Sequence, residues 1–223
     1  MKRMRRILAA AAAVGTALAA SVPAAQAAAQ MSIWDGVAAT PIVIVDGGSG
    51  DANAVAGAIT WIGSIGVWTV NVDTGLSKPI LGTATNGHLD FSFVDVSSGA
   101  GTLTLMFTDT DFTGTGPRPL LAEIGGTTGG SVSYDVYADS SNTPFGMEQH
   151  LTSLSFGASP YAGGESALFN TSGLYSLTQV ITISHRAAGV SSGDAEARVP
   201  EPASMALLGL GLAGLGWARR RRA

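Results

Sequence analysis

The nine residues GTLTLMFTD, positions 101–109, alternate between apolar and polar side chains along most of their length. One face carries three apolar side chains and the other three threonines, namely Leu103, Leu105 and Phe107 against Thr102, Thr104 and Thr108. Successive side chains of a strand point to opposite faces of a sheet, so this period of two predicts a half-buried β-strand.

Similar stretches recur along the chain. The strand candidates are 41–46, 58–63, 66–72, 88–96, 131–139, 150–156 and 174–185. Turn-forming clusters separate them, including GTGPRP (114–119), GGTTGG (125–130) and ASPYAGGES (158–166). Between the two ends of the chain, no window of eleven or more residues carries a helical stripe. About ten short strands predict an all-β fold, an antiparallel β-sandwich or jelly roll. A β-solenoid is the competing architecture, but no fixed repeat period is present.

The first 27 residues have the order of a secretory signal peptide. Lys2, Arg3, Arg5 and Arg6 precede an apolar run at 7–20, and the small-residue site Ala25-Gln26-Ala27 follows. We expect signal peptidase to cleave near Ala27, reading Ala25 and Ala27. An uncleaved membrane anchor is the alternative, but the apolar run is short for a span.

The last 25 residues, VPEPASMALLGLGLAGLGWARRRRA (199–223), have three parts. Pro200, Glu201 and Pro202 come first, then the uncharged run 203–218, then the basic cluster Arg219, Arg220, Arg221 and Arg222. As a helix rising about 1.5 Å per residue, the run reaches about 24 Å, a little short of a bilayer core of about 30 Å. It predicts a C-terminal transmembrane helix whose arginines stop on the cytoplasmic side. A buried helix of a soluble domain is the alternative.

This ending resembles the PEP-CTERM sorting signal of Gram-negative bacteria, a tail also catalogued under an ice-binding-protein label. The resemblance implies processing near Pro-Glu-Pro by an exosortase, a membrane-embedded cysteine protease-transpeptidase. It also implies sorting to the surface and an association with exopolysaccharide and biofilm. IWDG (33–36), VDGGSGD (45–51), the stretch 57–79 and GTLTLMFTDTDFT (101–113) more loosely resemble a β-rich region of other PEP-CTERM proteins. That second resemblance bears on fold and location alone.

These signals predict a β-sandwich domain at 28–186, a flexible linker at 187–198 and the sorting signal at 199–223. Between Ala28 and Glu201, four basic residues face sixteen acidic ones, a net charge of −12. Such a charge excludes nucleic acid as a partner. Because cysteine is absent, disulfides, cysteine zinc sites and cysteine nucleophiles are excluded.

Two loops hold closely spaced carboxylates of the kind that a hard cation needs. They are Asp46 and Asp51 in DGGSGD, and Asp109 and Asp111 in TDTD. Ca²⁺ is the ion that such oxygen ligands suit, although neither loop fits an EF-hand and turn formation also explains both. Beyond this candidate, no cofactor is expected.

Catalytic motifs are weak in this sequence. His88, His150 and His185 each lie at the end of a predicted strand, and nothing in the sequence brings one to a serine and a carboxylate. GVSSG (189–193) matches G-x-S-x-G, but it falls in the predicted linker with no helix after it. GLGLAG (209–214) matches the dinucleotide-binding motif G-x-G-x-x-G, but it lies in the uncharged C-terminal run and not in a βαβ unit. We therefore predict no enzyme.

The aromatic residues leave a binding function open. Either a sugar-stacking platform or the core would use Trp34, Trp61, Trp68, Tyr137 and Tyr161. The prediction is an exported, non-catalytic protein of the cell surface or extracellular matrix, reached through an inner-membrane intermediate. A carbohydrate-binding module retained in exopolysaccharide is the alternative. A secreted hydrolase is the third, and it would need a pocket joining a histidine to Asp or Glu.

Overall fold

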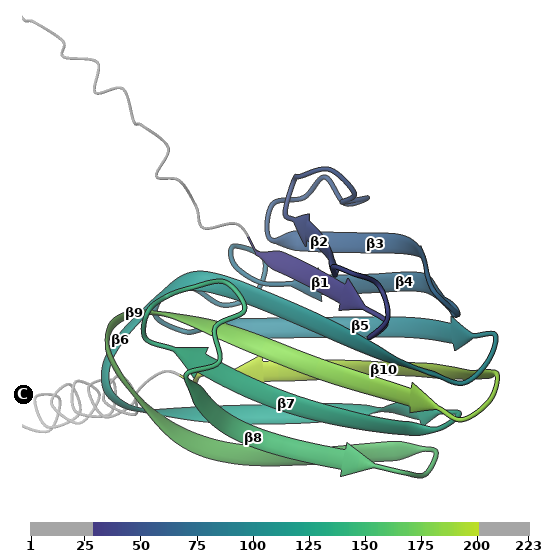
Figure 1. Cartoon of the computed structure of the whole chain (residues 1–223). Coiled ribbons are helices and arrows are strands. Elements are labelled where there is room, and N and C mark those ends of the chain that lie inside the picture. Colours follow the sequence, from purple (N-terminus) through teal and green to yellow (C-terminus); the bar gives the residue numbers. More distant parts are fainter. Residues whose placement is uncertain (1–28, 201–223) are drawn as a thin grey trace, which may run out of the picture.

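The computed structural model describes residues 29–200, which fold into ten β-strands without a helix (Figure 1). The strands are β1 Gln30–Trp34, β2 Ile42–Val45, β3 Ala58–Ile65, β4 Trp68–Leu76, β5 His88–Ser97, β6 Gly101–Thr128, β7 Ser131–Asp139, β8 Gln149–Phe156, β9 Tyr161–His185 and β10 Gly189–Arg198. All their pairings are antiparallel, which confirms the predicted fold class. No helix in this part of the chain is long and apolar enough to cross a bilayer. The predicted signal peptide and transmembrane helix lie outside the described residues.

Two very long strands, β6 and β9, organise the sheet. They pair with each other over most of their length, and the register shifts between Asp109 and Phe112. Asp111 has a φ of 58° at this point, the left-handed conformation that a bulge uses. Both strands turn at the left of Figure 1 and run back. Each therefore contributes one half to each of two layers, and the result is sandwich-like.

The pairing partners define the layers. The first half of β6 and the second half of β9 join one layer in the order β2-β1-β6-β9-β7-β8. The other halves join the second layer in the order β3-β4-β5-β10-β6-β9. The two strands thus cross from layer to layer without a loop.

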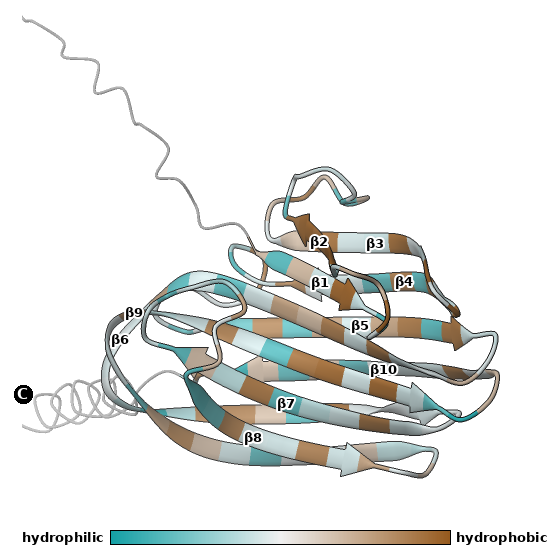
Figure 2. Cartoon of the chain, viewed as in Figure 1, coloured by the Kyte–Doolittle hydropathy of each residue, from teal (hydrophilic) through white to brown (hydrophobic). Residues whose placement is uncertain are grey.

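One apolar core lies between the layers. Leu103, Leu105 and Phe107 are fully buried, which confirms the apolar face predicted for 101–109, whereas Thr108 on the opposite face is fully buried as well. Figure 2 shows the same alternation of brown and teal along several strands. Burying such side chains stabilises a fold by about 1.5–3 kcal/mol each.

The predicted linker at 187–198 is wrong. Residues Gly189–Arg198 form β10, which pairs with β5 on one side and β6 on the other. Its inward side chains are small, and aromatic side chains of the same layer occupy the space beside them: a Cβ at Gly193 would lie 2.5 Å from the Tyr161 hydroxyl and 2.7 Å from Phe93 Cζ. Small, polar composition indicated flexibility, whereas backbone pairing on both sides makes this a central strand. The sheet continues to Arg198.

Two predicted turn clusters also lie inside strands. GTGPRP (114–119) belongs to β6, and most of ASPYAGGES (158–166) belongs to β9. Proline donates no backbone hydrogen bond and is tolerated where a strand lacks a second neighbour. Pro117 and Pro119 fit this rule, because β6 pairs only with β9 there and meets β10 from Leu121 onward.

Candidate functional site

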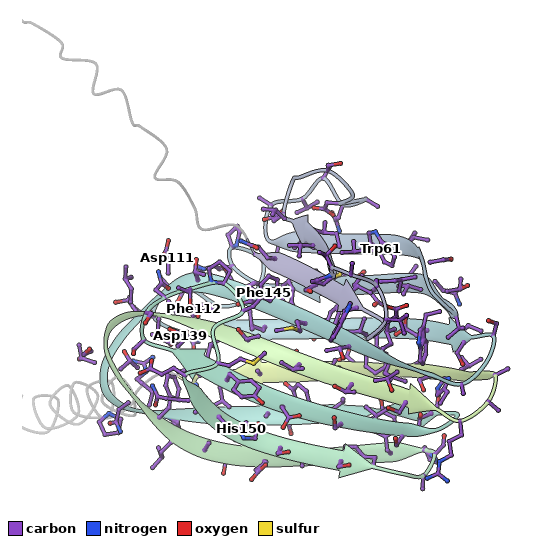
Figure 3. The ribbon with its side chains drawn as sticks, viewed as in Figure 1. Trp61, Asp111, Phe112, Asp139, Phe145 and His150 are labelled. Carbon is purple, nitrogen blue, oxygen red and sulfur yellow. The ribbon has the colours of Figure 1, made fainter. Side chains whose placement is uncertain are left out.

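The connections gather at two ends of the molecule (Figure 1). The turns 98–100, 129–130, 157–160 and 186–188 lie at one end, named here the hairpin-tip end. The bends of β6 and β9 and the loop 140–148 lie at the other, the bend end. Figure 3 labels Asp111, Phe112, Asp139 and Phe145 at the bend end. Candidate residues occur at both.

The first predicted cation loop is organised by its own carboxylates. Asp51 accepts hydrogen bonds from the backbone N–H groups of Asn53 (2.8 Å) and Thr60 (3.0 Å). Its second oxygen accepts from Gly47 N at 3.0 Å. Asp46 accepts from Gly57 N at 2.7 Å. Both side chains shape the loop, and Ca²⁺ there remains a prediction.

The second pair of predicted ligands has two different sets of partners. Asp109 is fully buried and lies 2.7 Å from Lys78 Nζ, and Ser77 Oγ donates to it at 2.6 Å. Asp111 instead exchanges hydrogen bonds with Asn142, which joins the β6 bulge to the loop 140–148. Among residues 29–200, no group of three or more Asp, Glu, His or Cys is placed to hold a metal ion.

Lys78 secures the bend end through its ion pair. Its ammonium group lies 4.3 Å above the centre of the Phe112 ring and donates to Thr110 O. Burial raises the pKa of Asp109, and the hydrogen bond and charge of Lys78 act in the opposite direction. The bulge therefore contains a buried charge that depends on one lysine.

The histidines are separated, and none completes a hydrolytic triad. His150 Nε2 lies 2.9 Å from Asp135 Oδ1, and the His150 ring stacks on the Tyr137 ring with centroids 4.7 Å apart. Figure 3 labels His150. His88 Nε2 lies 2.8 Å from Glu196 Oε1. Neither has a serine hydroxyl among its hydrogen-bond partners in residues 29–200. His185 has hydroxyl partners and no carboxylate partner. Serine, histidine and carboxylate side chains are all present, but no histidine in the described chain is hydrogen-bonded to both of the others.

His185 lies within a buried chain of hydroxyl groups at the hairpin-tip end. Its Nδ1 is 2.7 Å from Ser97 Oγ and its Nε2 is 2.8 Å from Ser191 Oγ. Ser191 Oγ lies 2.8 Å from Thr128 Oγ1, which accepts from Gly130 N. Because Ser97 donates to Ala187 O at 3.4 Å, it accepts from Nδ1–H, and Nε2 then accepts from Ser191.

This directional chain needs a neutral imidazole. Burial lowers the pKa of His185, and the Trp68 ring packs against it with centroids 4.8 Å apart. Ser191 is the serine of the GVSSG match, and it lies in a strand paired on both sides rather than on an elbow. The hydrogen-bonded chain through His185 connects β5, β9 and β10 to the turn after β6.

The five candidate aromatic residues do not form one platform. Trp68 and Tyr161 are buried in the core. Trp34, 40% exposed, lies on β1 and donates to Ala38 O, whereas Trp61 lies on β3 in the other layer. Tyr137, on β7, stacks on His150. A stacking surface made from all five is therefore not present.

Two buried carboxyl groups had no signal in the sequence. Asp73 and Asp95 are fully buried, and three of their four oxygens have no hydrogen-bond partner in this part of the chain. Burial raises the pKa of Asp95 to about 7, and burial and Asp95 raise that of Asp73. A register shift between Val70 and Thr74 turns Asp73 inward and leaves Val72 exposed. Strict alternation would place Val72 on the same face as Val70.

Two hollows lie on the surface of the part of the chain that the structure describes, among others. One, of about 530 Å³, lies on the second layer and is lined by Glu123, Ile124, Gly125, Ala162, Gly163, Asp194 and Glu196. Two of these lining residues, Asp194 and Glu196, act on Asp90: burial and their charges raise the pKa of Asp90 to about 6. The other, of about 570 Å³, is at the hairpin-tip end and is lined by Gly129, Gly130, Ser131, Gly157, Ser184, Arg186 and Ala187.

Comparison with known proteins identifies the end of the chain. Residues 198–222 match the PEP-CTERM protein-sorting motif. The chain thus carries this motif, as its last residues predicted, and the motif implies export and sorting to the cell surface or beyond. No curated protein matches the chain in sequence.

Solved structures match this chain only at low similarity. The K1 cleaved adhesin domain of Lys-gingipain from Porphyromonas gingivalis W83 is 13% identical with a TM-score of 0.34, over 65% of this chain and 98% of that one. TmCBM61, solved with β-1,4-galactotriose, is 8% identical with a TM-score of 0.33, over 60% and 90%. Similarity at this level assigns neither ligand nor activity.

Proposed function

We propose that this chain is a secreted, exosortase-processed, non-catalytic protein of the cell surface or extracellular matrix, associated with exopolysaccharide. The observation that carries the proposal is the PEP-CTERM motif at 198–222. Signal peptidase removes residues 1–27 during export. The run 203–218 then halts in the inner membrane, because moving each arginine of 219–222 through hydrocarbon costs about 2.5–3.5 kcal/mol.

The junction between the sheet and the tail supports processing at the Pro-Glu-Pro motif. Val199 is fully buried and its N–H donates to Gly87 O at 2.8 Å. Backbone before Pro200 is therefore engaged in the folded sheet. Pro200 and Pro202 disfavour a continuous helix and restrict the residue before each of them to extended conformations, which suits a protease. We expect cleavage near Pro-Glu-Pro, on the C-terminal side of the folded sheet.

The non-catalytic assignment rests on the separation of the polar groups. Both carboxylate-paired histidines lack a hydroxyl partner within residues 29–200, and the hydroxyl-bonded His185 is buried without a carboxylate partner. Acyl transfer would need all three groups in one place.

The test measures processing in the native host. Glu201→Ala, and separately deletion of 219–222, should leave full-length protein in the membrane fraction, while the unaltered protein is shortened and released. Intact mass and fractionation give the readout. If the unaltered protein stays full-length in the inner membrane with an exosortase present, the tail is a simple anchor and the proposal is wrong.

The second candidate function is a carbohydrate-binding module retained in exopolysaccharide. The hollow at the hairpin-tip end favours it, because glycines, hydroxyl groups and one arginine surround a volume within the range of small-molecule sites. Mixing the mature protein with exopolysaccharide from the same host, followed by sedimentation, tests retention. Protein that stays wholly in the supernatant would argue against this candidate.

A further inference from the structure

The hollow at the hairpin-tip end is built from three separate connections. Gly129 and Gly130 come from the turn after β6, and Gly157 directly follows β8. Ser184 closes β9, and Arg186 follows it. The site therefore exists only in the folded sheet.

Arg186 differs from the other basic residues of the described chain. Lys78 is paired with Asp109, and Arg198 with Glu123 and Glu196. Arg118 is buried and donates to Thr85 O. Within residues 29–200, Arg186 is exposed and has no carboxylate within ion-pair distance, although sixteen acidic residues lie between Asp35 and Glu201.

The base of the hollow is tightly packed. A Cβ at Gly130 would lie 2.0 Å from Ser184 O and 2.9 Å from His185 Cδ2, so the turn lies directly against the end of β9. Gly130 N also donates to Thr128 Oγ1, the first hydroxyl of the His185 chain. Gly157 has no atom within 4 Å of where its Cβ would be. The hollow is thus fixed below and open at one wall.

We propose that this pocket binds the carboxylate of an acidic saccharide, a uronic acid residue of a polysaccharide. A guanidinium fork pairs two parallel N–H donors with the two oxygens of a carboxylate. A single arginine balances a single charge, so a monoanionic sugar suits the site better than a phosphate ester with two charges. Ser131 and Ser184 line the same hollow and supply hydroxyl groups for sugar hydroxyls.

The acidity of the rest of the domain limits the ligand rather than excluding it. Charges beyond about 8 Å are largely screened at physiological ionic strength. A uronate at Arg186 is therefore screened from acidic residues more than about 8 Å away. The proposal names the ligand of the second candidate function and rests on it.

The position of the pocket suits an extracellular ligand. Strand β10 runs from Gly189 beside the pocket to Arg198 beside the sorting motif, and ten strand residues at about 3.3 Å each span about 33 Å. Figure 1 shows β10 pointing from the hairpin tips toward the bend end. While the tail is in the membrane, the pocket is held at the opposite end of the strand.

Calorimetric titration of the full chain in detergent with digalacturonate tests the proposal. We expect binding that weakens with added NaCl, and about tenfold to a hundredfold weaker binding for Arg186→Ala. Arg186→Lys should lie between, because it retains the charge and loses the fork. Arg198→Ala is the matched control, since it removes a cation remote from the pocket, and it should bind like the unaltered protein.

Three results would overturn the proposal: no binding by the unaltered protein, equal binding of neutral digalactose, or unchanged binding by Arg186→Ala. Equally tight binding of inorganic sulfate would also overturn it, because the pocket would then be a general anion site. Processing of the tail in the host is measured separately. A chain that is shortened and released but binds no uronate contradicts this inference alone.

Discussion

The two ends of the sandwich are held by opposite kinds of polar contact. At the bend end, where β6 and β9 cross between layers, a buried ion pair joins Lys78 to Asp109. At the hairpin-tip end, a neutral chain of hydroxyl groups passes through His185. Removing one partner of a buried ion pair leaves the other charge buried and unpaired, which costs much stability. In a neutral hydrogen-bonded chain, the contribution to stability is spread over several bonds. Mutations at the two ends should therefore differ in size and in pH dependence.

The largest effect is expected from Lys78→Met. This change leaves the Asp109 carboxylate buried without its cation, and breaking a buried pair from one side costs about 3–5 kcal/mol. Chemical denaturation should show this loss in the free energy of unfolding. The double variant Lys78→Met, Asp109→Leu should recover much of it, because no unpaired charge remains. If single and double variants are equally destabilised, the ion pair does not secure the bend.

A smaller loss is expected at the hairpin-tip end. His185→Ala leaves the hydroxyls of Ser97 and Ser191 without their imidazole partner and opens a space beneath Trp68. We expect a loss of about 2–3 kcal/mol in the free energy of unfolding. Thr128→Val, which removes only the outer link of the chain, serves as the comparison and should cost less. Equal losses for both variants would contradict the central place of His185.

Asp95→Asn should stabilise the protein, and only at higher pH. The pKa of Asp95 is raised by burial to about 7 from an ordinary 3.8, so the folded state favours the protonated acid. Near pH 4 the residue costs the fold little. As pH rises toward 7 the unfolded chain ionises first, and stability falls. The variant should match the unaltered protein near pH 4 and exceed it by about 1–2 kcal/mol at pH 8. A constant difference across this range would argue against a buried titrating acid.

His185 should give the opposite slope with pH. Because burial lowers the pKa of His185, its contribution is fully present above its ordinary value of 6.5 and is lost as pH falls below it. His185→Gln should remove a loss of stability that develops as pH falls below 6.5, and Asp95→Asn should remove a loss that develops as pH rises from about 4 to 7. Thermal melts at intervals between pH 4 and 8 separate the two.

The smallest effect is expected for Arg198→Ala. This arginine is 43% exposed, and its partner Glu123 is 57% exposed. Pairs in such surroundings contribute about 0–1 kcal/mol. Raising the NaCl concentration should reduce even this difference, whereas salt should scarcely affect the Lys78→Met result. A loss as large as that of Lys78→Met would show that exposure does not distinguish the two pairs.

Local patterns predicted the elements that have one clean apolar face. β7 coincides with the predicted 131–139, and β5 and β8 match within a residue. β10 was missed because its inward residues are Ser191, Gly193, Ala195 and Ala197, which have no apolar signature. Its strand character comes from pairing with β5 and β6, and such pairing joins residues 63 to 110 positions apart in the chain.

The polar sites were harder to predict for a related reason. Closely spaced carboxylates suggested a shared ligand at Asp109 and Asp111, but the bulge between them gives each its own partner. Asp73 faces the core because two neighbouring strands shift register. Charge counting did isolate Arg186 as one of four basic residues outside the ends, but only the fold shows which three have partners.

The central position of β10 also determines when the protein is able to fold. During export the chain emerges from its N-terminus, and β5 and β6 are outside the membrane before their shared neighbour arrives. Until Arg198 has crossed, β5 and the second half of β6 have a gap between them, and the core side chains beneath it stay exposed to water. Folds dominated by such distant pairings complete slowly, over milliseconds to seconds. Because β10 ends at Arg198, where the PEP-CTERM motif begins, the sheet closes only after the chain has been exported as far as its sorting motif.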